Sequence, residues 1–351
     1  MTHELLDTKT IDEILSLLSR YWVELKHLEH FNARTIDEVI SLLNEYKEEA
    51  KIIAGGTDLI RLMKSRVTRP KALVNIKTIP DLAYITEDAE GLKIGALTTI
   101  KDIEASPIIR DKYNILAEAA HAVATPHIRN MATIVGNLCQ DVQCWYYRRP
   151  PITGRSFFCR RKGGELCYAV AGDNRYHAII GGGECWAVCP SDMAPALVAL
   201  DARVKITGSD EERIVPLEEF YTVLGNILKP NEIITDIWVP SLRPTTKQRY
   251  LKFRERKTID FAISSVAVVI TTENRVVTNA RIVLGGIAPM PYRASGAEEV
   301  LKGETITESL AEIAARAAVS GANPLKNNAH KVPITETLVK RAINMTVNEK
   351  M

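Results

Sequence analysis

Outside residues 139–189, this 351-residue chain contains no cysteine. The six cysteines that it does have are Cys139, Cys144, Cys159, Cys167, Cys185 and Cys189. Chance would scatter them along the chain, so one compact site that uses several thiolates is the simpler interpretation. Thiolate sulfur suits zinc, iron–sulfur clusters or disulfides.

The chain also lacks an excess of charge of either sign and a long apolar run. Its 45 Lys and Arg residues nearly balance 43 Asp and Glu residues, which excludes the basic surface of a nucleic-acid binder. The N-terminus has no apolar h-region, and the longest apolar stretch, around 261–270, is far below the ~20 residues that span a bilayer. We therefore expect a cytoplasmic protein without membrane contact, where clustered cysteines more often bind metal than form disulfides.

Length and hydrophobic periodicity predict two or three domains of the α+β class. The pattern T-I-D-E opens two similar segments, 10–18 and 35–43, and each predicts a capped amphipathic helix. We predict strands at 72–76, 92–97, 262–271 and 275–285, helices at 60–65, 115–124, 298–301, 309–320 and 336–347, and further regular structure at 193–200 and 204–207. The cysteine segment is poor in periodicity and is predicted to be an inserted loop module. Pro240 and Pro244 predict a domain boundary.

Two glycine-containing segments are candidates for nucleotide binding. Residues 54–59, A-G-G-T-D-L, lie between a predicted strand and a predicted helix, where backbone N–H groups can approach a phosphate. Residues 132–138, A-T-I-V-G-N-L, offer a hydroxyl, a glycine and an amide. Neither is a G-x-G-x-x-G or a Walker loop, and a tight turn explains each one taken alone.

Taken in order, five segments carry a more specific pattern. They are residues 54–59, 128–138, 191–197, 251–254 and 260–262. Together they resemble the FAD-binding subunit of the xanthine oxidase/carbon monoxide dehydrogenase family of molybdenum enzymes, over roughly residue 31 to the C-terminus. Val135 stands where that family usually has a first glycine.

This resemblance implies a two-part α+β FAD-binding domain at 31–243 with an insertion at 139–190, and an α+β C-terminal domain at 244–351. Residues 1–30 precede the resemblance and are predicted to form a helical N-terminal extension. The two glycine segments would hold the pyrophosphate and ribityl regions of FAD. Asp192 would contact the adenosine side, and Lys252 would lie near the flavin ring. The implied cofactor-binding residues are Ala54, Gly55, Gly56, Thr57, Asp58, Leu59, Thr133, Gly136, Asn137, Asp192 and Lys252.

Within that family, the cysteine segment resembles the insertion of the 4-hydroxybenzoyl-CoA reductase β subunit, which carries a 4Fe–4S cluster. The implied ligands are Cys144, Cys159, Cys167 and Cys185. Cys189 is the rival of Cys185, and Cys139 belongs to the second glycine segment. Spacing alone leaves zinc and iron–sulfur open, because neither a full set of C-x2-4-C pairs nor the compact ferredoxin run is present.

Basic and aromatic residues accompany the cysteines at 145–149 and 160–162. Two interpretations stay open. One is a docking face for an acidic, ferredoxin-like electron carrier, and the other is a positive charge that offsets the negative charge of a thiolate-bound cluster.

We therefore expect an FAD/4Fe–4S electron-transfer subunit of a molybdenum reductase of the 4-hydroxybenzoyl-CoA type, with substrate chemistry on a partner. The implied partners are a molybdopterin-containing large subunit and a 2Fe–2S small subunit, in a dimer of heterotrimers. One alternative is the FAD subunit of a molybdenum hydroxylase that oxidises xanthine, an aldehyde or an N-heterocycle. A second is a zinc-stapled FAD-binding protein without electron transfer.

Overall fold

The computed structural model of the protein describes residues 28–149 and 157–348. Its N-terminal part is a small parallel sheet of β1 (Glu29–Asn32), β3 (Ala72–Asn75) and β2 (Ala50–Ile53), in that order, with α2 (Ile36–Tyr46), η2 (Lys47–Glu49) and α3 (Leu59–Lys64). The cap predicted for α2 is confirmed, since Thr35 Oγ1 accepts a 3.1 Å hydrogen bond from the Glu38 N–H. The helix predicted at 10–18 lies outside the described residues.

The middle part is a five-stranded antiparallel sheet with helices beside it. The strand order is β4 (Ile85–Glu87), β5 (Gly91–Gly95), β10 (Ile233–Pro240), β6 (Arg203–Thr207) and β7 (Glu212–Pro216), and β8 (Tyr221–Thr222) pairs with β9 (Gly225–Asn226). The helices are α4 (Ile100–Ala105), α5 (Pro107–Lys112), α6 (Asn114–Ala122), α7 (Pro126–Arg129), α8 (Ile134–Leu138), α10 (Met193–Ala199) and α11 (Leu217–Phe220). Of these helices, only α6 was predicted as a helix, and regular structure was predicted where α10 lies; the position of β10 between β5 and β6 was not predicted.

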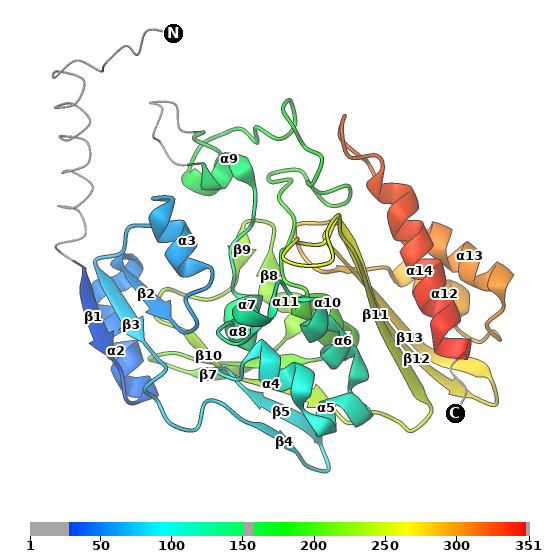
Figure 1. Cartoon of the computed structure of the whole chain (residues 1–351), viewed down its shortest axis with the longest axis horizontal. Coiled ribbons are helices and arrows are strands. Elements are labelled where there is room, and N and C mark those ends of the chain that lie inside the picture. Colours follow the sequence, from blue (N-terminus) through cyan, green and yellow to red (C-terminus); the bar gives the residue numbers. More distant parts are fainter. Residues whose placement is uncertain (1–27, 150–156, 349–351) are drawn as a thin grey trace, which may run out of the picture.

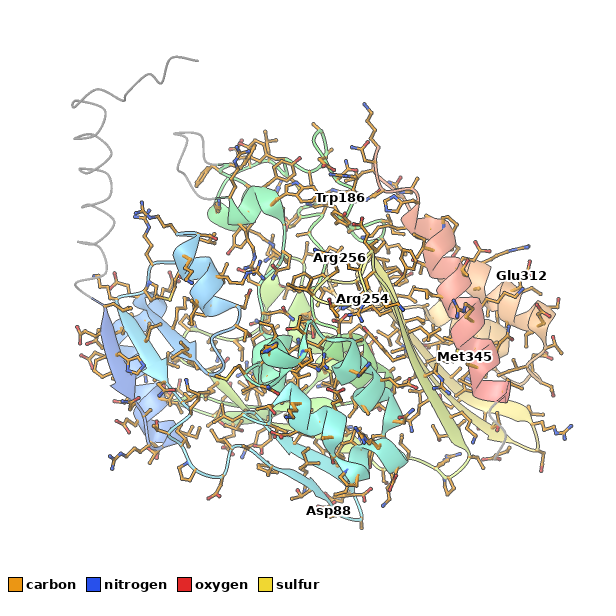
Figure 2. The ribbon with its side chains drawn as sticks, in the orientation of Figure 1. Asp88, Trp186, Arg254, Arg256, Glu312 and Met345 are labelled. Atoms are coloured by element: carbon orange, nitrogen blue, oxygen red, sulfur yellow. The ribbon has the colours of Figure 1, made fainter. Side chains whose placement is uncertain are left out.

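The C-terminal part is a four-stranded sheet of β11 (Thr246–Phe253), β12 (Ser264–Glu273), β13 (Val276–Gly285) and β14 (Tyr292–Arg293). α6 and α10 contact one face, and α12 (Ser295–Leu301) and α14 (Lys331–Asn348) contact the same sheet, with α13 (Glu308–Ala318) packed on both of these helices. Figure 2 marks α13 by Glu312 and α14 by Met345, on the outer side of this part. The β12–β13 turn contains Asn274 and Arg275, both with positive φ.

The apolar run of β12 is explained by burial on both faces of its sheet. Ala267 and Val269 pack into the core of the middle part, whereas Val266, Val268 and Ile270 pack into the core beneath the C-terminal helices. Successive side chains of a strand point to opposite faces, so a strand covered on both sides reads as continuously apolar. The boundary predicted near residue 243 falls between β10 and β11, but one hydrophobic core continues across it.

The cysteine segment lies over the junction of these parts, with α9 (Trp145–Arg148) near α3 and its later residues near the N-terminal end of α14 (Figure 1). As predicted, it has little regular structure: α9, the single 3-10 turn η4 (Arg160–Lys162) and irregular chain in its described residues. No helix in the described ranges is long and apolar enough to cross a bilayer.

Candidate functional site

A cavity of about 470 Å³ lies between the N-terminal and middle parts, and both glycine segments line it. We call it the glycine-loop cavity. The predicted residues that line it are Ala54, Gly55, Gly56, Thr57, Asp58, Leu59, Thr133 and Gly136. The sequence pattern therefore identified two segments that are far apart in the chain and share one cavity.

Close backbone approach explains why Gly55 is a glycine. A Cβ at this position would lie 1.9 Å from the Met131 carbonyl oxygen, so no larger residue fits without separating the two segments. Gly56 has φ +69°, a left-handed conformation that favours glycine at the turn into α3. The second segment is held by its own cap, in which Thr133 Oγ1 accepts a hydrogen bond from the Gly136 N–H.

Each carboxylate that lines the glycine-loop cavity is paired with an arginine. Asp58 lies 2.7 Å from Arg148, Asp141 lies 3.4 Å from Arg161, and Glu232 is paired with Arg213. This pairing removes the electrostatic repulsion that free carboxylates would exert on an anionic ligand. A pyrophosphate therefore fits the cavity on charge as well as on backbone geometry.

Asp58 has a role that the sequence did not predict. Its carboxylate accepts hydrogen bonds from the Asp141 N–H at 2.9 Å and from Arg148 Nη2 at 2.7 Å. The Arg148 side chain is 11% exposed and that of Asp58 is 17% exposed. Asp58 thus joins the first glycine segment to the cysteine segment, and Arg148 is withdrawn from the surface that was predicted to dock a carrier.

Asn137, Asp192 and Lys252 lie elsewhere. Asn137 is buried and accepts a 2.7 Å hydrogen bond from Ser191, which ties the second glycine segment to the start of α10. Lys252 Nζ lies 2.6 Å from Asp192 Oδ2, and Tyr250 donates to the same carboxylate at 3.1 Å. Because Asp192 and Lys252 contact each other, we assign them to one place rather than to opposite ends of an extended FAD.

A second cavity, of about 340 Å³, lies on the other side of the same chain segment; we call it the central cavity. Residues 139–141 line the glycine-loop cavity, whereas 143–145 line the central cavity. Its lining also includes Asp192 and residues of the 255–263 segment. Figure 2 marks this last segment by Arg256, in the middle of the molecule, with Trp186 of the cysteine segment above it.

The four predicted ligand cysteines line one small cavity, which we call the thiol cavity: Cys144, Cys159, Cys167 and Cys185. Cys139 lines the glycine-loop cavity and Cys189 the central cavity, and neither lines the thiol cavity, whereas Cys144 lines both the central cavity and the thiol cavity. All six cysteines are free. Among the described residues, no group of His, Cys, Asp or Glu side chains is arranged to hold a single metal ion.

Burial governs the ionisation of several of these thiols. It raises the pKa of Cys144 to about 11 and those of Cys139 and Cys189 to about 12, so these three are protonated at neutral pH in the free protein. A metal that bound Cys144 would displace its proton, because a coordinated thiol is deprotonated.

Two nitrogen donors point at sulfurs of the thiol cavity. Arg161 Nε lies 3.3 Å from Cys185 Sγ, and His177 Nε2 lies 3.3 Å from Cys144 Sγ. Burial lowers the pKa of His177 to about 4, so its ring is neutral at pH 7. Neither contact was predicted, because residues 24 and 33 positions from their partners leave no periodic signal in the sequence.

A buried lysine attaches the cysteine segment to the C-terminal part. Lys331, at the start of α14, is fully buried and donates from Nζ to the carbonyl oxygens of Tyr176, His177 and Gly286 at 2.6–3.1 Å. Asn328 adds a 3.2 Å hydrogen bond to the His177 carbonyl. The segment is thus fixed at one end to the first glycine loop and at the other to α14.

Comparison with known families supports the assignment of both halves. Residues 26–242 match the family described as the FAD binding domain in molybdopterin dehydrogenase, and residues 249–346 match the CO dehydrogenase flavoprotein C-terminal domain. The interval between the two matches begins within the turn between β10 and β11.

Individual relatives and a solved structure agree with these matches. The chain is 36% identical to the aldehyde oxidoreductase FAD-binding subunit PaoB of Escherichia coli K12, over 72% of this chain and 79% of that protein. It is 30% identical to the carbon monoxide dehydrogenase medium chain of Hydrogenophaga pseudoflava, over 84% and 88%. The carbon monoxide dehydrogenase structure from that organism, which lacks the Mo-pyranopterin moiety, superposes with a TM-score of 0.74 at 28% identity, covering 92% of this chain and 97% of that one.

The close approach at Gly55 generates a test of the glycine-loop cavity. Gly55→Ala is expected to weaken FAD binding by about 1–3 kcal/mol, roughly 5- to 150-fold in Kd, because the new methyl group forces the two glycine segments apart. Flavin titration monitored by fluorescence measures the change. Gly296→Ala, whose Cβ would meet nothing closer than 3.9 Å, is the matched control. Equal FAD affinity in the two variants would contradict this assignment.

Proposed function

The chain belongs to the family of FAD-binding medium subunits of molybdopterin dehydrogenases, and from this premise we propose that it is the FAD subunit of a molybdenum hydroxylase-type dehydrogenase. The observation that carries the proposal is the glycine-loop cavity, in which both family segments meet. The relatives support this function better than the function first expected from the cysteine segment, a reductase of the 4-hydroxybenzoyl-CoA type. An aldehyde is the substrate class that the name of the 36% identical relative suggests.

The residues of the glycine-loop cavity would hold the FAD pyrophosphate. Residues 54–59 and Thr133–Gly136 supply the close backbone approach, and the arginine-paired carboxylates leave the cavity without free negative charge. FAD, when bound, supplies reversible transfer of one or two electrons. This chain's own residues would bind and orient the cofactor, and the Asp192–Lys252 pair would stand beside the central cavity.

The partners proposed for this chain are a molybdopterin-containing large subunit and a 2Fe–2S small subunit, in a dimer of heterotrimers. The support is the naming of its relatives as a FAD-binding subunit and a medium chain, terms that imply partner chains. Substrate oxidation would then occur on the large subunit. The FAD subunit would pass the electrons onward.

Purification of the tagged full-length chain from its native cells tests this proposal. Molybdenum is expected to co-purify in about a one-to-one ratio with FAD, and the eluate is expected to oxidise aldehydes with a dye as electron acceptor. The same chain expressed alone and loaded with FAD serves as the control and is expected to show no such activity. An eluate rich in FAD but free of molybdenum would contradict the proposal.

We further propose that the thiol cavity holds a 4Fe–4S cluster, with Cys144, Cys159, Cys167 and Cys185 as ligands. The support is the convergence of these four free thiols from distant positions, together with nitrogen donors that would stabilise negatively charged sulfur. A structural zinc ion uses the same ligand type and is the competing occupant.

A matched pair of variants tests the ligand set. Cys185 and Cys189 are both 7% exposed, but only Cys185 lines the thiol cavity. Anaerobically purified Cys185→Ser is expected to lose most of its iron and acid-labile sulfide, whereas Cys189→Ser is expected to keep the wild-type content of about four of each. Zinc in place of iron in the wild type, or iron loss in Cys189→Ser alone, would refute the assignment.

The surface next to the thiol cavity is proposed as the docking site of an acidic, ferredoxin-like carrier. Arg149 and Arg160 are exposed there, and the apolar side chains of Phe158, Leu166 and Val170 are 50–66% exposed. Positive charge around an apolar centre fits an acidic protein partner. Arg148 and Arg161 are excluded from this surface, since their side chains are only 11% and 8% exposed and take part in ion pairs.

Reversal of charge at Arg149 and Arg160 tests the docking surface. The double variant Arg149→Glu/Arg160→Glu is expected to slow electron exchange with ferredoxin about tenfold at low ionic strength and to flatten its salt dependence, because charge steers the encounter. Stopped-flow absorbance measures the rate. Arg243→Glu, which changes another exposed arginine, between β10 and β11, is the control. A double variant that behaves like this control would eliminate the surface.

A further inference from the structure

We propose that Arg161 and His177 are positioning residues that donate N–H···S hydrogen bonds to the ligand sulfurs of Cys185 and Cys144, and that they thereby raise the reduction potential of the cluster. The inference rests on the cluster proposed above. It concerns residues that no ligand motif contains, since neither one is a cysteine and neither adjoins the cysteine that it contacts.

The guanidinium of Arg161 is oriented by bonds on all three of its nitrogens. Nη1 lies 3.0 Å from the Leu224 carbonyl oxygen and 3.4 Å from Asp141, and Nη2 donates to the Val223 carbonyl at 3.0 Å. These partners leave Nε directed at Cys185 Sγ, 3.3 Å away. With the side chain only 8% exposed, water competes little for this donor.

The imidazole of His177 is also held in one orientation by its neighbours. Its backbone carbonyl accepts hydrogen bonds from Lys331 and Asn328, and its ring packs edge-on against Trp145 at a centroid distance of 5.4 Å. Nδ1 has no hydrogen-bond partner among the described residues. In the tautomer with its proton on Nε2, the N–H donates to Cys144 Sγ, and Nδ1 is left as an unpaired acceptor. The tautomer with its proton on Nδ1 would instead bury an unpaired donor, which costs more free energy.

Both contacts act in the same direction on a metal cluster. Reduction adds negative charge that is shared with the ligand sulfurs, so N–H donors stabilise the reduced state more than the oxidised state. A charged donor forms the stronger hydrogen bond, so Arg161 should contribute more than His177. Removal of either donor should therefore make the midpoint potential more negative.

Neighbouring residues supply matched controls. Arg160 is adjacent in sequence and carries the same charge, but its side chain is 44% exposed and forms an ion pair with Glu184 rather than a hydrogen bond to a sulfur. Tyr176 adjoins His177 and hydrogen-bonds to Glu255 at 2.6 Å. Arg160→Gln and Tyr176→Phe thus change charge or polarity beside the site without removing a sulfur contact.

Redox titration of the full-length chain, monitored by electron paramagnetic resonance, provides the test. Arg161→Gln and His177→Gln are expected to shift the midpoint potential to more negative values, the first by more, while Arg160→Gln and Tyr176→Phe keep the wild-type value. Arg161→Lys, which retains the charge without the fixed fork of donors, is expected to fall between Arg161→Gln and wild type. Unchanged potentials in Arg161→Gln and His177→Gln at full iron content, or an equal shift in Arg160→Gln, would overturn the proposal.

A second measurement needs no variant, in case a substitution prevents cluster assembly. Resonance Raman spectra of wild-type protein produced in H2O and in D2O are expected to differ in their Fe–S stretching bands, because deuteration alters N–H···S bonds. Identical spectra would overturn the proposal. Wild-type protein without iron would instead refute the cluster itself, so the two failures are distinguishable.

Discussion

The ion pair between Asp58 and Arg148 determines how the two proposed cofactor sites lie relative to each other. Asp58 lies in the first glycine segment, and Arg148 ends α9 of the cysteine segment; their side chains meet at 2.7 Å. These side chains are only 17% and 11% exposed, so the loss of one partner would leave the other charge largely shielded from water and without compensation. This contact and the Asp141–Arg161 pair connect the glycine-loop cavity with the thiol cavity, and Tyr147, one residue before Arg148, lines both.

The other end of the cysteine segment is also held by the contacts of one charged side chain. Lys331 donates hydrogen bonds to three backbone carbonyls, two of them from residues 176 and 177. These bonds fix the chain next to the thiol cavity. Burial lowers the pKa of this lysine to about 7, although the three carbonyl acceptors favour its charged form. A segment with almost no regular structure is thus held by buried polar contacts to rigid elements on either side, which is what a precise ligand geometry requires.

Local patterns predicted much of the fold, and distant contacts account for what they missed. The capped helix after Thr35 follows from its periodicity, and strand β12 follows from its continuous apolar run; a sequence displays both directly. The eight predicted cofactor-binding residues that line the glycine-loop cavity came from the family resemblance of ordered segments. By contrast, the sequence did not predict the Asp58–Arg148 ion pair or the contact of Arg161 with Cys185. Both contacts join positions that have no fixed sequence spacing. The resemblance distinguished Cys185 from Cys189 only weakly, whereas the packing places them in different cavities.

The central claim is that one chain holds a flavin and, joined to it through the Asp58–Arg148 contact, a four-cysteine iron cluster. Crystals of the anaerobically purified protein with FAD, measured on both sides of the iron absorption edge, test it most directly. The account predicts compact anomalous density for iron enclosed by Cys144, Cys159, Cys167 and Cys185, with the FAD pyrophosphate against Gly55 in the glycine-loop cavity. Anomalous density at the zinc edge alone, or FAD bound away from the two glycine segments, would contradict it.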